Sequence, residues 1–380
     1  MRILIAGGGS GGHIQPALAV VRSLRERHAD LELLWVGGRR GLEATLVPEA
    51  GIPLRRLWLR SLRSVDRSVN LVLDPLRLLS SGPQALAILI RWRPAAIFTT
   101  GGYVAIPILI AAWLLRVPTL LWEGNLVPGR SVRAMARSAS VVAVSFAGTA
   151  TALGRRCYVT GTPTRPLADV DRVAARERFG LGPDARVLLV FGGSQAVQRF
   201  DEAIDGALPT LVARWTVIHI AGTDGLAAAE RRRAALPQAV QGRYRVHAFL
   251  GAEMADGLAA ADVVLGRAGS STLAEVTALG RPLIAVPYPH AGAHQAENAR
   301  LVAEAGAATV VADSAFDAAA LLAALAALED PARATLMSAA SRALGRPGAA
   351  AALAELLGAL AERRTLPGDD AIAAIAAGAA

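Results

Sequence analysis

The sequence predicts an α/β protein of two doubly wound domains, each a parallel sheet covered by helices. The main observation is a repeated succession of apolar strand, glycine-rich turn and helix, which opens at residue 3 and returns at residue 186. The second observation is length, because 380 residues are enough for two domains of ordinary size. Abundant Ala, Leu and Val with few aromatic residues suit helices packed on parallel sheets.

Apolar runs bounded by turn residues place the individual elements. In the first half we expect strands at residues 3–6, 31–36, 96–99, 118–122 and 141–144, and helices at residues 15–27, 105–115 and 127–139. In the second half we expect strands at residues 186–191, 216–221, 245–248, 263–265, 283–286 and 308–311, and a helix at residues 273–279. Beyond residue 313 the pattern is helical to about residue 364, and a loose tail follows.

Composition limits the compartment and the partners. The formal charge is +9, carried mainly by arginine, which suits phosphorylated ligands, nucleic acid or an anionic membrane face without choosing among them. The single cysteine, Cys157, excludes an internal disulfide and a CxxC metal site. No signal-peptide layout precedes the first strand. The apolar run at residues 103–115 contains Pro107 and is shorter than the roughly 20 residues that span a bilayer, so we expect no transmembrane helix.

The stretch at residues 261–299 carries the strongest ligand signal. A buried strand at residues 262–265 leads into a turn of small residues and then a helix, and such a helix N-terminus attracts anions such as a diphosphate. Glu275 near that N-terminus has two interpretations: it binds the 2′- and 3′-hydroxyls of a ribose, or it forms a capping box with Thr272. Polar side chains that follow the next strand, including His294, Gln295 and Asn298, lie where open α/β sheets bind ligands.

The first glycine-rich turn also has two interpretations. Gly7-x-Gly9-x-x-Gly12 matches the dinucleotide fingerprint, and Arg39-Arg40 after the second strand would suit NADP, so a reductase is one hypothesis. His13 directly after the last glycine points elsewhere. An imidazole at a helix N-terminus stays neutral and can act as a general base or donate to a phosphate. The alternative for His13 is a cap or a space-filling side chain.

Two further patterns are weaker. Residues 55–93 mix apolar side chains with arginines, including Arg60, Arg63 and Arg67, as in a basic amphipathic surface at an anionic membrane, or in an ordinary helix pair with solvated arginines. Asp169-Val170-Asp171 resembles a DxD metal motif, but it lies in the turn-rich segment after Gly161, so a solvated turn is the preferred interpretation.

Several motifs in a fixed order carry a family resemblance. They are GGSGGHIQPA at residues 8–17, TGGY at 100–103, EGNLVPG at 123–129, GTPTR at 161–165, GGSQ at 192–195 and RAGSSTLAE at 267–275. Together they resemble the peptidoglycan N-acetylglucosaminyltransferases of glycosyltransferase family 28. The resemblance implies a GT-B fold: two Rossmann-like domains facing a cleft, at residues 1–162 and 163–344, with a C-terminal helix at about 345–364 crossing back to the first domain and a flexible tail at 365–380.

The resemblance also implies the reaction and the site. Such enzymes transfer N-acetylglucosamine from UDP-GlcNAc to the 4-hydroxyl of MurNAc in undecaprenyl-diphospho-MurNAc-pentapeptide, with inversion. The catalytic candidates are His13 as base, Tyr103 and Asn125. The donor-binding candidates include Ser10, Gly11, Gly12 and Asn125, in the loop that also faces the acceptor diphosphate. By similarity the diphosphate contacts Arg165, Ser194 and the turn Gly269, Ser270, Ser271, Thr272 and Leu273. Glu275 then holds the ribose, Leu250 after Phe249 the uracil, and His294, Gln295 and Asn298 the sugar.

The implied partners are UDP-GlcNAc, the lipid-linked acceptor and the anionic cytoplasmic face of a bacterial membrane, with no cofactor, no metal and no nucleic acid. The chain departs from the family at Gly124, Thr162, Ala105, Ile106 and Ala196, mostly in acceptor-side motifs. A related GT-B enzyme acting on another lipid or natural-product acceptor therefore stays open. So does a non-catalytic nucleotide-binding scaffold at the membrane.

Overall fold

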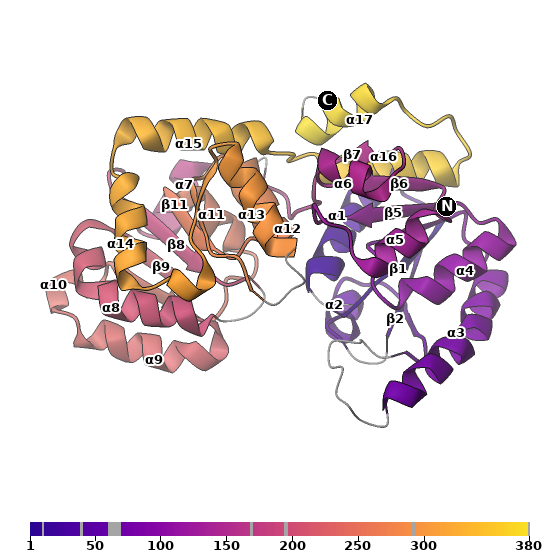
Figure 1. Ribbon diagram of the computed structural model, residues 1–380, viewed down its shortest axis with the longest axis horizontal. Coiled ribbons are helices and arrows are strands. Elements are labelled where there is room, and N and C mark those ends of the chain that lie inside the picture. The colour runs from indigo at the N-terminus through magenta and orange to yellow at the C-terminus, as the bar shows by residue number, and fades with distance from the viewer. Residues whose placement is uncertain are drawn as a thin grey trace. The chain divides into compact units, whose positions relative to one another are not determined.

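The computed structural model describes residues 1–9, 11–38, 41–59, 70–167, 170–193, 197–289 and 294–378; the side chains of residues 70–76, 78 and 79 are outside this description. The chain forms two compact units (Figure 1), unit 1 from Met1–Arg165 with Arg346–Ala380, and unit 2 from Pro166–Gly345. The domain boundaries expected from the sequence, 162/163 and 344/345, lie close to these divisions.

Unit 1 contains a seven-stranded parallel sheet in the order β3-β2-β1-β4-β5-β6-β7. Its strands are β1 (Arg2–Ala6), β2 (Glu32–Gly37), β3 (Leu54–Arg56), β4 (Ala96–Thr99), β5 (Thr119–Glu123), β6 (Val141–Val144) and β7 (Tyr158–Val159). Its helices are α1 (Gly11–Arg27), α2 (Glu43–Glu49), α3 (Asn70–Trp92), α4 (Ala105–Leu115), α5 (Arg130–Ala136), α6 (Ala147–Leu153), α16 (Ala349–Ala361) and α17 (Asp369–Ala377). Expected strands are present, whereas β3 and β7 are short and were not predicted.

Alternation along the strands fills both faces of this sheet. Ile3 and Ile5 of β1 point to the face covered by α1 and α16, and Leu4 and Ala6 point to the face covered by α3, α4 and α5. All four are fully buried, so β1 is a central strand with helices on both sides. Helix α1 begins at Gly11, earlier than the expected residue 15, and Pro16 therefore lies inside it rather than at its first turn.

The expected flexible tail is wrong for most of its length. Residues 369–377 form α17, in which Ile372 and Ala376 are fully buried in the unit 1 core against α16. Tyr158 Oη donates to Pro367 O at 3.0 Å, and Gly348 N donates to Ala376 O at 2.9 Å. The apolar spacing of the Ala-rich segment is helical, and burying Ile372 stabilises it in place.

Unit 2 contains a six-stranded parallel sheet in the order β10-β9-β8-β11-β12-β13. Its strands are β8 (Val187–Phe191), β9 (Thr216–Ile220), β10 (Tyr244–His247), β11 (Val263–Gly266), β12 (Leu283–Ala285) and β13 (Ala308–Val310). Its helices are α7 (Arg172–Arg178), α8 (Gln198–Arg214), α9 (Gly222–Ala235), α10 (Gln238–Gln241), α11 (Met254–Ala260), α12 (Ser270–Ala278), α13 (His294–Glu304), α14 (Ala318–Ala327), α15 (Pro331–Leu344) and the 3₁₀ helix η1 (Asp313–Ala315).

The core of unit 2 lies between the sheet and helices α8, α9 and α14, around Phe200, Leu211 and Phe316. All six predicted strands are present. Most have nearly continuous apolar sequences, as expected in a buried parallel sheet, whereas the edge strand β10 is polar in part and only partly buried. Across the described residues, every helix falls short of the combined length and hydrophobicity needed to cross a bilayer.

Candidate functional site

In both sheets the glycine-rich turns lie at the topological switch point. The order of strands reverses between β1 and β4 in unit 1, and between β8 and β11 in unit 2. In open α/β sheets ligands bind outside the carboxyl ends of the strands at this position. The motif turns follow β1, β4 and β5 in unit 1, and β8 and β11 in unit 2, so each unit gathers its motifs at one edge.

His13, in the first turn of α1, is held by the neighbouring motif. Its Nδ1 lies 2.8 Å from the carbonyl oxygen of Thr100, which directly precedes Gly101-Gly102-Tyr103. A carbonyl oxygen can only accept, so Nδ1 carries the proton in this contact. In the neutral tautomer that this contact selects, the lone pair lies on Nε2, at the switch point of unit 1.

The turns after β1 and β4 approach each other closely. A Cβ at Gly7 would lie 2.9 Å from Thr100 Oγ1, and one at Gly102 would lie 3.9 Å from Gly8 O. Gly101 and Gly102 both have left-handed backbones, with φ of 81° and 82°. Glycine is the residue that adopts this conformation without strain, and Tyr103 follows at once. Tyr103 directly follows the residue of this turn that approaches Gly8.

Glu43 holds the glycine loop in place, and the sequence analysis did not single it out. It is 1% exposed and begins α2, and its carboxylate accepts from Gly9 N at 2.8 Å through Oε2 and from Gly38 N at 3.0 Å through Oε1. A Cβ at Gly8 would lie 2.5 Å from Oε1. The carboxylate therefore joins the glycine loop to the end of β2.

Glu43 also counts against the dinucleotide interpretation. In that fold the glycine-loop N–H groups face the cofactor's pyrophosphate, whereas here a buried carboxylate already accepts from Gly9. A second negative charge at the same amides would be repelled. The residues offered for NADP, Arg39 and Arg40, lie outside the described residues.

Glu123 organises the third motif of unit 1 at the end of β5. It is 5% exposed, and its Oε1 accepts from Asn125 N at 2.9 Å and from Asn125 Nδ2 at 3.0 Å. Its Oε2 accepts from Gly129 N at 3.2 Å, immediately before α5. These bonds fix the Asn125 side chain at the same sheet edge as His13. Gly124, where the chain differs from the family motif, lies inside this turn.

In unit 2 the turn after β11 leads directly into a helix N-terminus. Helix α12 starts at Ser270, and its N-cap residue, Gly269, has no side chain to cap it. The first-turn N–H groups, which include those of Ser271 and Thr272, have no acceptor inside a helix. Ser271 Oγ is buried and has no hydrogen-bond partner among the described residues. Unsatisfied donors of this kind at a helix start suit a phosphate-bearing ligand.

The capping interpretation of Glu275 is wrong. A capping box would need Thr272 as the N-cap residue, but the helix begins earlier, at Ser270, and Glu275 lies beyond its first turn. Glu275 is 8% exposed, on the same helix as the anion-binding turn. Of the two interpretations of Glu275, ribose binding is the one that remains.

The start of α13 lies beside the α12 turn. Asn298 is fully buried, and its Nδ2 donates to Ala268 O at 3.3 Å. Gln295 Nε2 would lie 3.9 Å from a Cβ at Gly269, while its Oε1 accepts from Tyr288 N at 2.9 Å. His294 Nδ1 is buried without a hydrogen-bond partner in the described part of the chain. The predicted sugar-binding side chains and the predicted diphosphate turn are thus brought together within unit 2.

Arg267, in the same motif, has a structural role. It is 9% exposed and donates to Val286 O at 3.0 Å and to Asp313 Oδ1 at 2.5 Å. Its guanidinium lies 5.1 Å from the ring centroid of Phe200 and 5.5 Å from that of Tyr288. These contacts tie the carboxyl ends of β11 and β12 together beneath the turn.

Other predicted residues are placed differently or are not described. Ser10, Ser194 and Ala196 lie outside the described residues, as do Arg60, Arg63 and Arg67. Gly193, just before Ser194, has φ of 92°, and no described atom lies within 4 Å of the position that a Cβ would take, so the backbone there is open to a ligand.

Arg165 ends unit 1 instead of lying in the donor domain. Leu250 is 2% exposed, whereas Phe249 is 75% exposed.

The DxD triplet has a structural explanation in its described part. Asp171 is the N-cap of α7, and its carboxylate accepts from Ala174 N at 2.7 Å. Asp169 lies outside the described residues. Among the residues that the structure does describe, no group of three or more His, Cys, Asp or Glu side chains could hold a metal ion.

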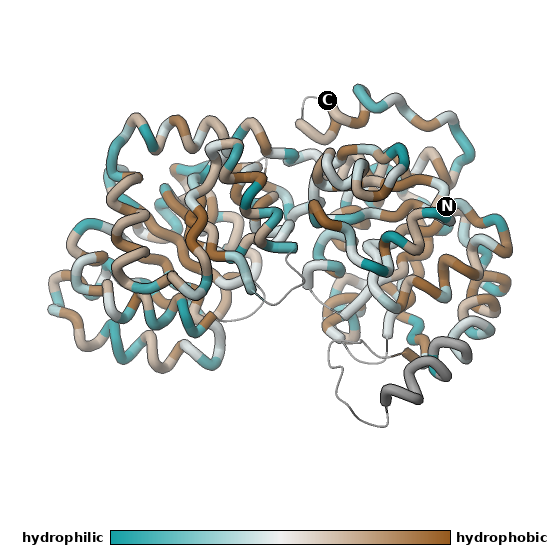
Figure 2. Tube along the Cα trace, viewed as in Figure 1, coloured by the Kyte–Doolittle hydropathy of each residue, from teal (hydrophilic) through white to brown (hydrophobic). Residues whose placement is uncertain are grey.

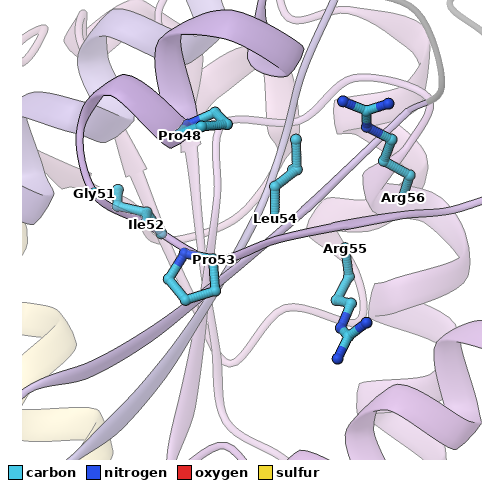
Figure 3. Close-up of a pocket in the computed structure, with 7 residues that line it drawn as sticks. All are labelled: Pro48, Gly51, Ile52, Pro53, Leu54, Arg55 and Arg56. Carbon is cyan, nitrogen blue, oxygen red and sulfur yellow. The ribbon is translucent and has the colours of Figure 1, made fainter.

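Two other features are distinct from this site. A hollow of about 770 Å³ runs along edge strand β3 beside Ile52 and Leu54, with Arg55 and Arg56 pointing away from each other (Figure 3). It is an open surface at the sheet edge, away from the motif turns.

His219 is 2% exposed with Nδ1 2.9 Å from Tyr244 Oη, and burial lowers the pKa of His219 to about 3. We interpret it as a neutral core residue.

Two parallel doubly wound sheets with glycine turns at their switch points define a nucleotide-binding α/β protein with two Rossmann-like units. The chain belongs to glycosyltransferase family 28, whose N-terminal domain matches residues 3–144 and whose C-terminal domain matches residues 187–353. The family resemblance drawn from the motifs is confirmed.

Curated relatives span nearly the whole chain. The UDP-N-acetylglucosamine–N-acetylmuramyl-(pentapeptide) pyrophosphoryl-undecaprenol N-acetylglucosamine transferase of Desulforudis audaxviator is 38% identical over 375 residues, 96% of this chain and 100% of that protein. The enzyme of the same name from Chlorobaculum parvum is 39% identical over 368 residues, 93% of this chain and 98% of that protein.

Solved structures confirm the predicted GT-B fold. MurG of Acinetobacter baumannii is 26% identical, with a TM-score of 0.77 over 94% of this chain and 99% of that chain. A glycosyltransferase of kitacinnamycin has a TM-score of 0.68 over 96% of this chain and 99% of that chain, but at 19% identity it shows the fold alone.

Proposed function

We propose that this protein transfers N-acetylglucosamine from UDP-GlcNAc to the 4-hydroxyl of MurNAc in undecaprenyl-diphospho-MurNAc-pentapeptide, converting lipid I to lipid II in peptidoglycan synthesis. Near-complete alignment with relatives of that name supports the substrates. The single structural observation that carries the proposal is the contact of His13 Nδ1 with Thr100 O at 2.8 Å, because it leaves Nε2 as the proton acceptor. An inverting transferase needs such a base on the acceptor hydroxyl.

The donor occupies unit 2. The first-turn amides of α12, with Ser270 and Ser271, bind the diphosphate, assisted by Ser194 and by Arg165 from the end of unit 1. Glu275 accepts hydrogen bonds from the ribose hydroxyls. Leu250 contacts the uracil through its backbone, and His294, Gln295 and Asn298 contact the sugar hydroxyls. Ser271 Oγ and His294 Nδ1 are buried and have no hydrogen-bond partner among the described residues, which supports this assignment because a bound donor would supply their hydrogen bonds.

The acceptor occupies the motif edge of unit 1, beside Gly11, Gly12, Tyr103 and Asn125. His13 Nε2 removes the proton of the MurNAc 4-hydroxyl as that oxygen attacks the anomeric carbon of N-acetylglucosamine. The bond from that carbon to the diphosphate oxygen breaks with inversion, and UDP leaves with the bonding electrons. The helix N-terminus of α12 stabilises the charge that develops on the diphosphate. His13 then returns its proton to solvent.

The departures on the acceptor side fit into the fold of unit 1. Thr162 is 3% exposed and its hydroxyl lies 2.7 Å from Ser145 Oγ, so it serves internal packing. Ala105 is fully buried at the start of α4. Neither change removes His13, Tyr103 or Asn125, which supports the lipid-linked MurNAc acceptor over another lipid or natural-product acceptor.

Turnover with defined substrates tests this function. UDP-GlcNAc is supplied with a short-chain lipid I analogue, and the disaccharide product is identified by mass. UDP-glucose and NADPH are offered separately, as is a glycolipid acceptor without MurNAc. We expect transfer only with UDP-GlcNAc and the MurNAc acceptor. Transfer to the other acceptor alone would favour a related GT-B enzyme, and UDP-GlcNAc binding without transfer would favour a nucleotide-binding scaffold.

Replacing Glu275 by alanine tests the ribose contact. We expect the variant to bind UDP more weakly by about 1–3 kcal/mol, because charge-assisted hydrogen bonds to two hydroxyls are lost. Calorimetry with UDP measures the change. Glu304→Ala, at the far end of α13, is the matched control and should bind UDP normally. Equal UDP affinity in Glu275→Ala and in the unmodified protein would remove the ribose assignment.

We also propose that unit 1 rests on an anionic membrane surface through α4 and the end of α3. Helices α3 and α4 are packed together, and Ile110, Trp113 and Leu114 of α4 are 56%, 65% and 58% exposed. Figure 2 shows how hydrophobic α4 is along its length. Ile90 of α3 is 52% exposed. Exposed arginines flank them, at Arg91, Arg93 and Arg116. Large apolar side chains framed by cations suit an interface of acyl chains and anionic headgroups, on the cytoplasmic face where the donor is available.

The double variant Trp113→Ser with Leu114→Ser tests this surface. We expect at least about tenfold weaker binding to phosphatidylglycerol vesicles, since burying each large apolar side chain contributes roughly 1.5–3 kcal/mol. Sedimentation with vesicles measures it. Leu336→Ser in unit 2, at a leucine 72% exposed, is the control. Equal vesicle binding by both variants would exclude α4 as the membrane contact.

A further inference from the structure

Unit 2 contains a polar hollow at the amino ends of its strands. The α12 turn lies at the opposite, carboxyl ends. The hollow measures about 320 Å³ and is lined by Arg172 at the start of α7, Asp262 before β11, Arg281 before β12, and Ser338 and Arg342 of α15. Asp262 and Arg281 precede their strands, whereas the donor turn follows β11. Four residues of β11 separate the two places, a distance of about 13 Å at 3.3 Å per residue. The hollow is therefore distinct from the donor site.

The lining carries more positive than negative charge. Arg172 forms an ion pair with Asp262 at 2.5 Å, and the neighbouring Arg176 lies 3.6 Å from the same carboxylate. Within the described ranges, Arg281 and Arg342 form no ion pair with any carboxylate. The lining thus has one carboxylate and three guanidinium groups, with Arg176 close by, and the surplus is positive.

The arginines are held in place by the backbone. Arg172 Nη1 donates to Ala261 O at 2.9 Å and Arg281 Nη2 donates to Ala259 O at 2.8 Å, so both cap the carboxyl end of α11. A Cβ at Gly280 would lie 3.0 Å from Arg342 Nε and 3.1 Å from its Nη2. Gly280 also has φ of 61°, which favours glycine. Arg342 therefore lies directly over the residue that precedes Arg281.

Hydrogen-bonding capacity in the cluster is incomplete. Arg281 Nε and Arg176 Nε are buried and have no hydrogen-bond partner among the residues the structure describes. An unsatisfied buried donor is costly, and more so on a charged group. Burial, together with the charges of Arg172, Arg342 and Arg176, lowers the pKa of Arg281 to about 10. An anion in the hollow would offset this repulsion and accept hydrogen bonds.

We propose that this hollow is a binding site for a small phosphate-bearing anion, separate from the UDP-sugar site. Arginine is the side chain best suited to tetrahedral phosphate oxygens, because its planar fork donates two parallel hydrogen bonds. Arg281 and Arg342 supply the uncompensated charge, and Ser338 supplies a hydroxyl from α15. Since the sites are at opposite ends of β11, phosphate and UDP bind simultaneously.

Calorimetric titration of the full chain with inorganic phosphate, in a phosphate-free buffer with saturating UDP, tests the site. We expect saturable binding that Arg342→Glu weakens about tenfold or more, because a guanidinium is replaced by a repelling carboxylate. Arg333→Glu is the matched control: it lies on the same helix, is exposed and does not line the hollow. It should bind phosphate within about twofold of the unmodified protein. Retained UDP affinity in both variants shows that they are folded.

A parallel titration with phosphatidylglycerol vesicles distinguishes free phosphate from a lipid headgroup. Selective weakening by Arg342→Glu in either titration supports the site and identifies its source of phosphate. The proposal is overturned if neither phosphate nor the vesicles give saturable binding once UDP is bound, or if both glutamate variants weaken that binding equally.

Discussion

His13→Ala is expected to lower turnover by about 10²–10⁴-fold, the range for loss of a positioned general base. The reason is geometric. Thr100 O fixes the proton on Nδ1, so the opposite ring nitrogen is the acceptor at the switch point of unit 1. Turnover is measured with UDP-GlcNAc and a lipid I analogue, and UDP affinity is measured separately by calorimetry. Affinity for UDP should be unchanged, because the donor is assigned to unit 2.

The control for this variant is His28→Ala. His28 follows α1 and lies 3.7 Å from Glu362, away from the motif turns, so its loss should leave turnover within about twofold. A loss of less than about tenfold in His13→Ala would move His13 from the base to acceptor binding. A matching loss of UDP affinity would contradict the assignment of the donor to unit 2.

Glu43→Ala is expected to affect both stability and turnover. The change leaves the amides of Gly9 and Gly38 without their acceptor at a site where Glu43 is 1% exposed. Each unsatisfied buried donor costs about 1–3 kcal/mol, so we expect a loss of roughly 2–6 kcal/mol in the free energy of unfolding. The glycine loop that carries His13 also loses its anchor to β2. Urea unfolding and turnover measure the two effects.

Glu43→Gln separates the loop-anchoring role from general destabilisation. A glutamine keeps one acceptor oxygen, so stability should recover in part, and turnover should recover with it if loop position is what matters. Glu49→Ala, on the exposed end of the same helix, is the control and should change neither quantity. Unchanged turnover in a folded Glu43→Ala protein would contradict the anchoring role.

The sequence predicts the strands of both sheets well because buried parallel strands are short, nearly uninterrupted apolar runs. It predicts the glycine turns for the same reason: left-handed backbones such as those at Gly101 and Gly102 favour one residue type. The C-terminal helix α17 was missed because its composition is close to that of a loose Ala-rich tail. Only its packing of Ile372 against the unit 1 core distinguishes the two.

The site is predicted less completely, because contacts between residues far apart in the sequence leave no local sequence pattern. Glu43 accepts from Gly9, 34 residues away in sequence, so no periodic pattern in its own segment indicates that contact. An acidic residue shortly after the turn that ends β2 was the available signal. Glu275 could not be separated from a capping box until the start of α12 was fixed at Ser270. The exposure of α4 was equally hidden, since an apolar helix suits a core or a membrane surface.

The most direct test of the central claim is a crystal structure of the protein with UDP-GlcNAc. We predict density for the diphosphate against the first turn of α12, with the ribose hydroxyls on the Glu275 carboxylate and the sugar near Gln295 and Asn298. Density for the nucleotide beside Gly7, Gly8 and Gly9 of unit 1, with no ligand near Glu275, would contradict the account.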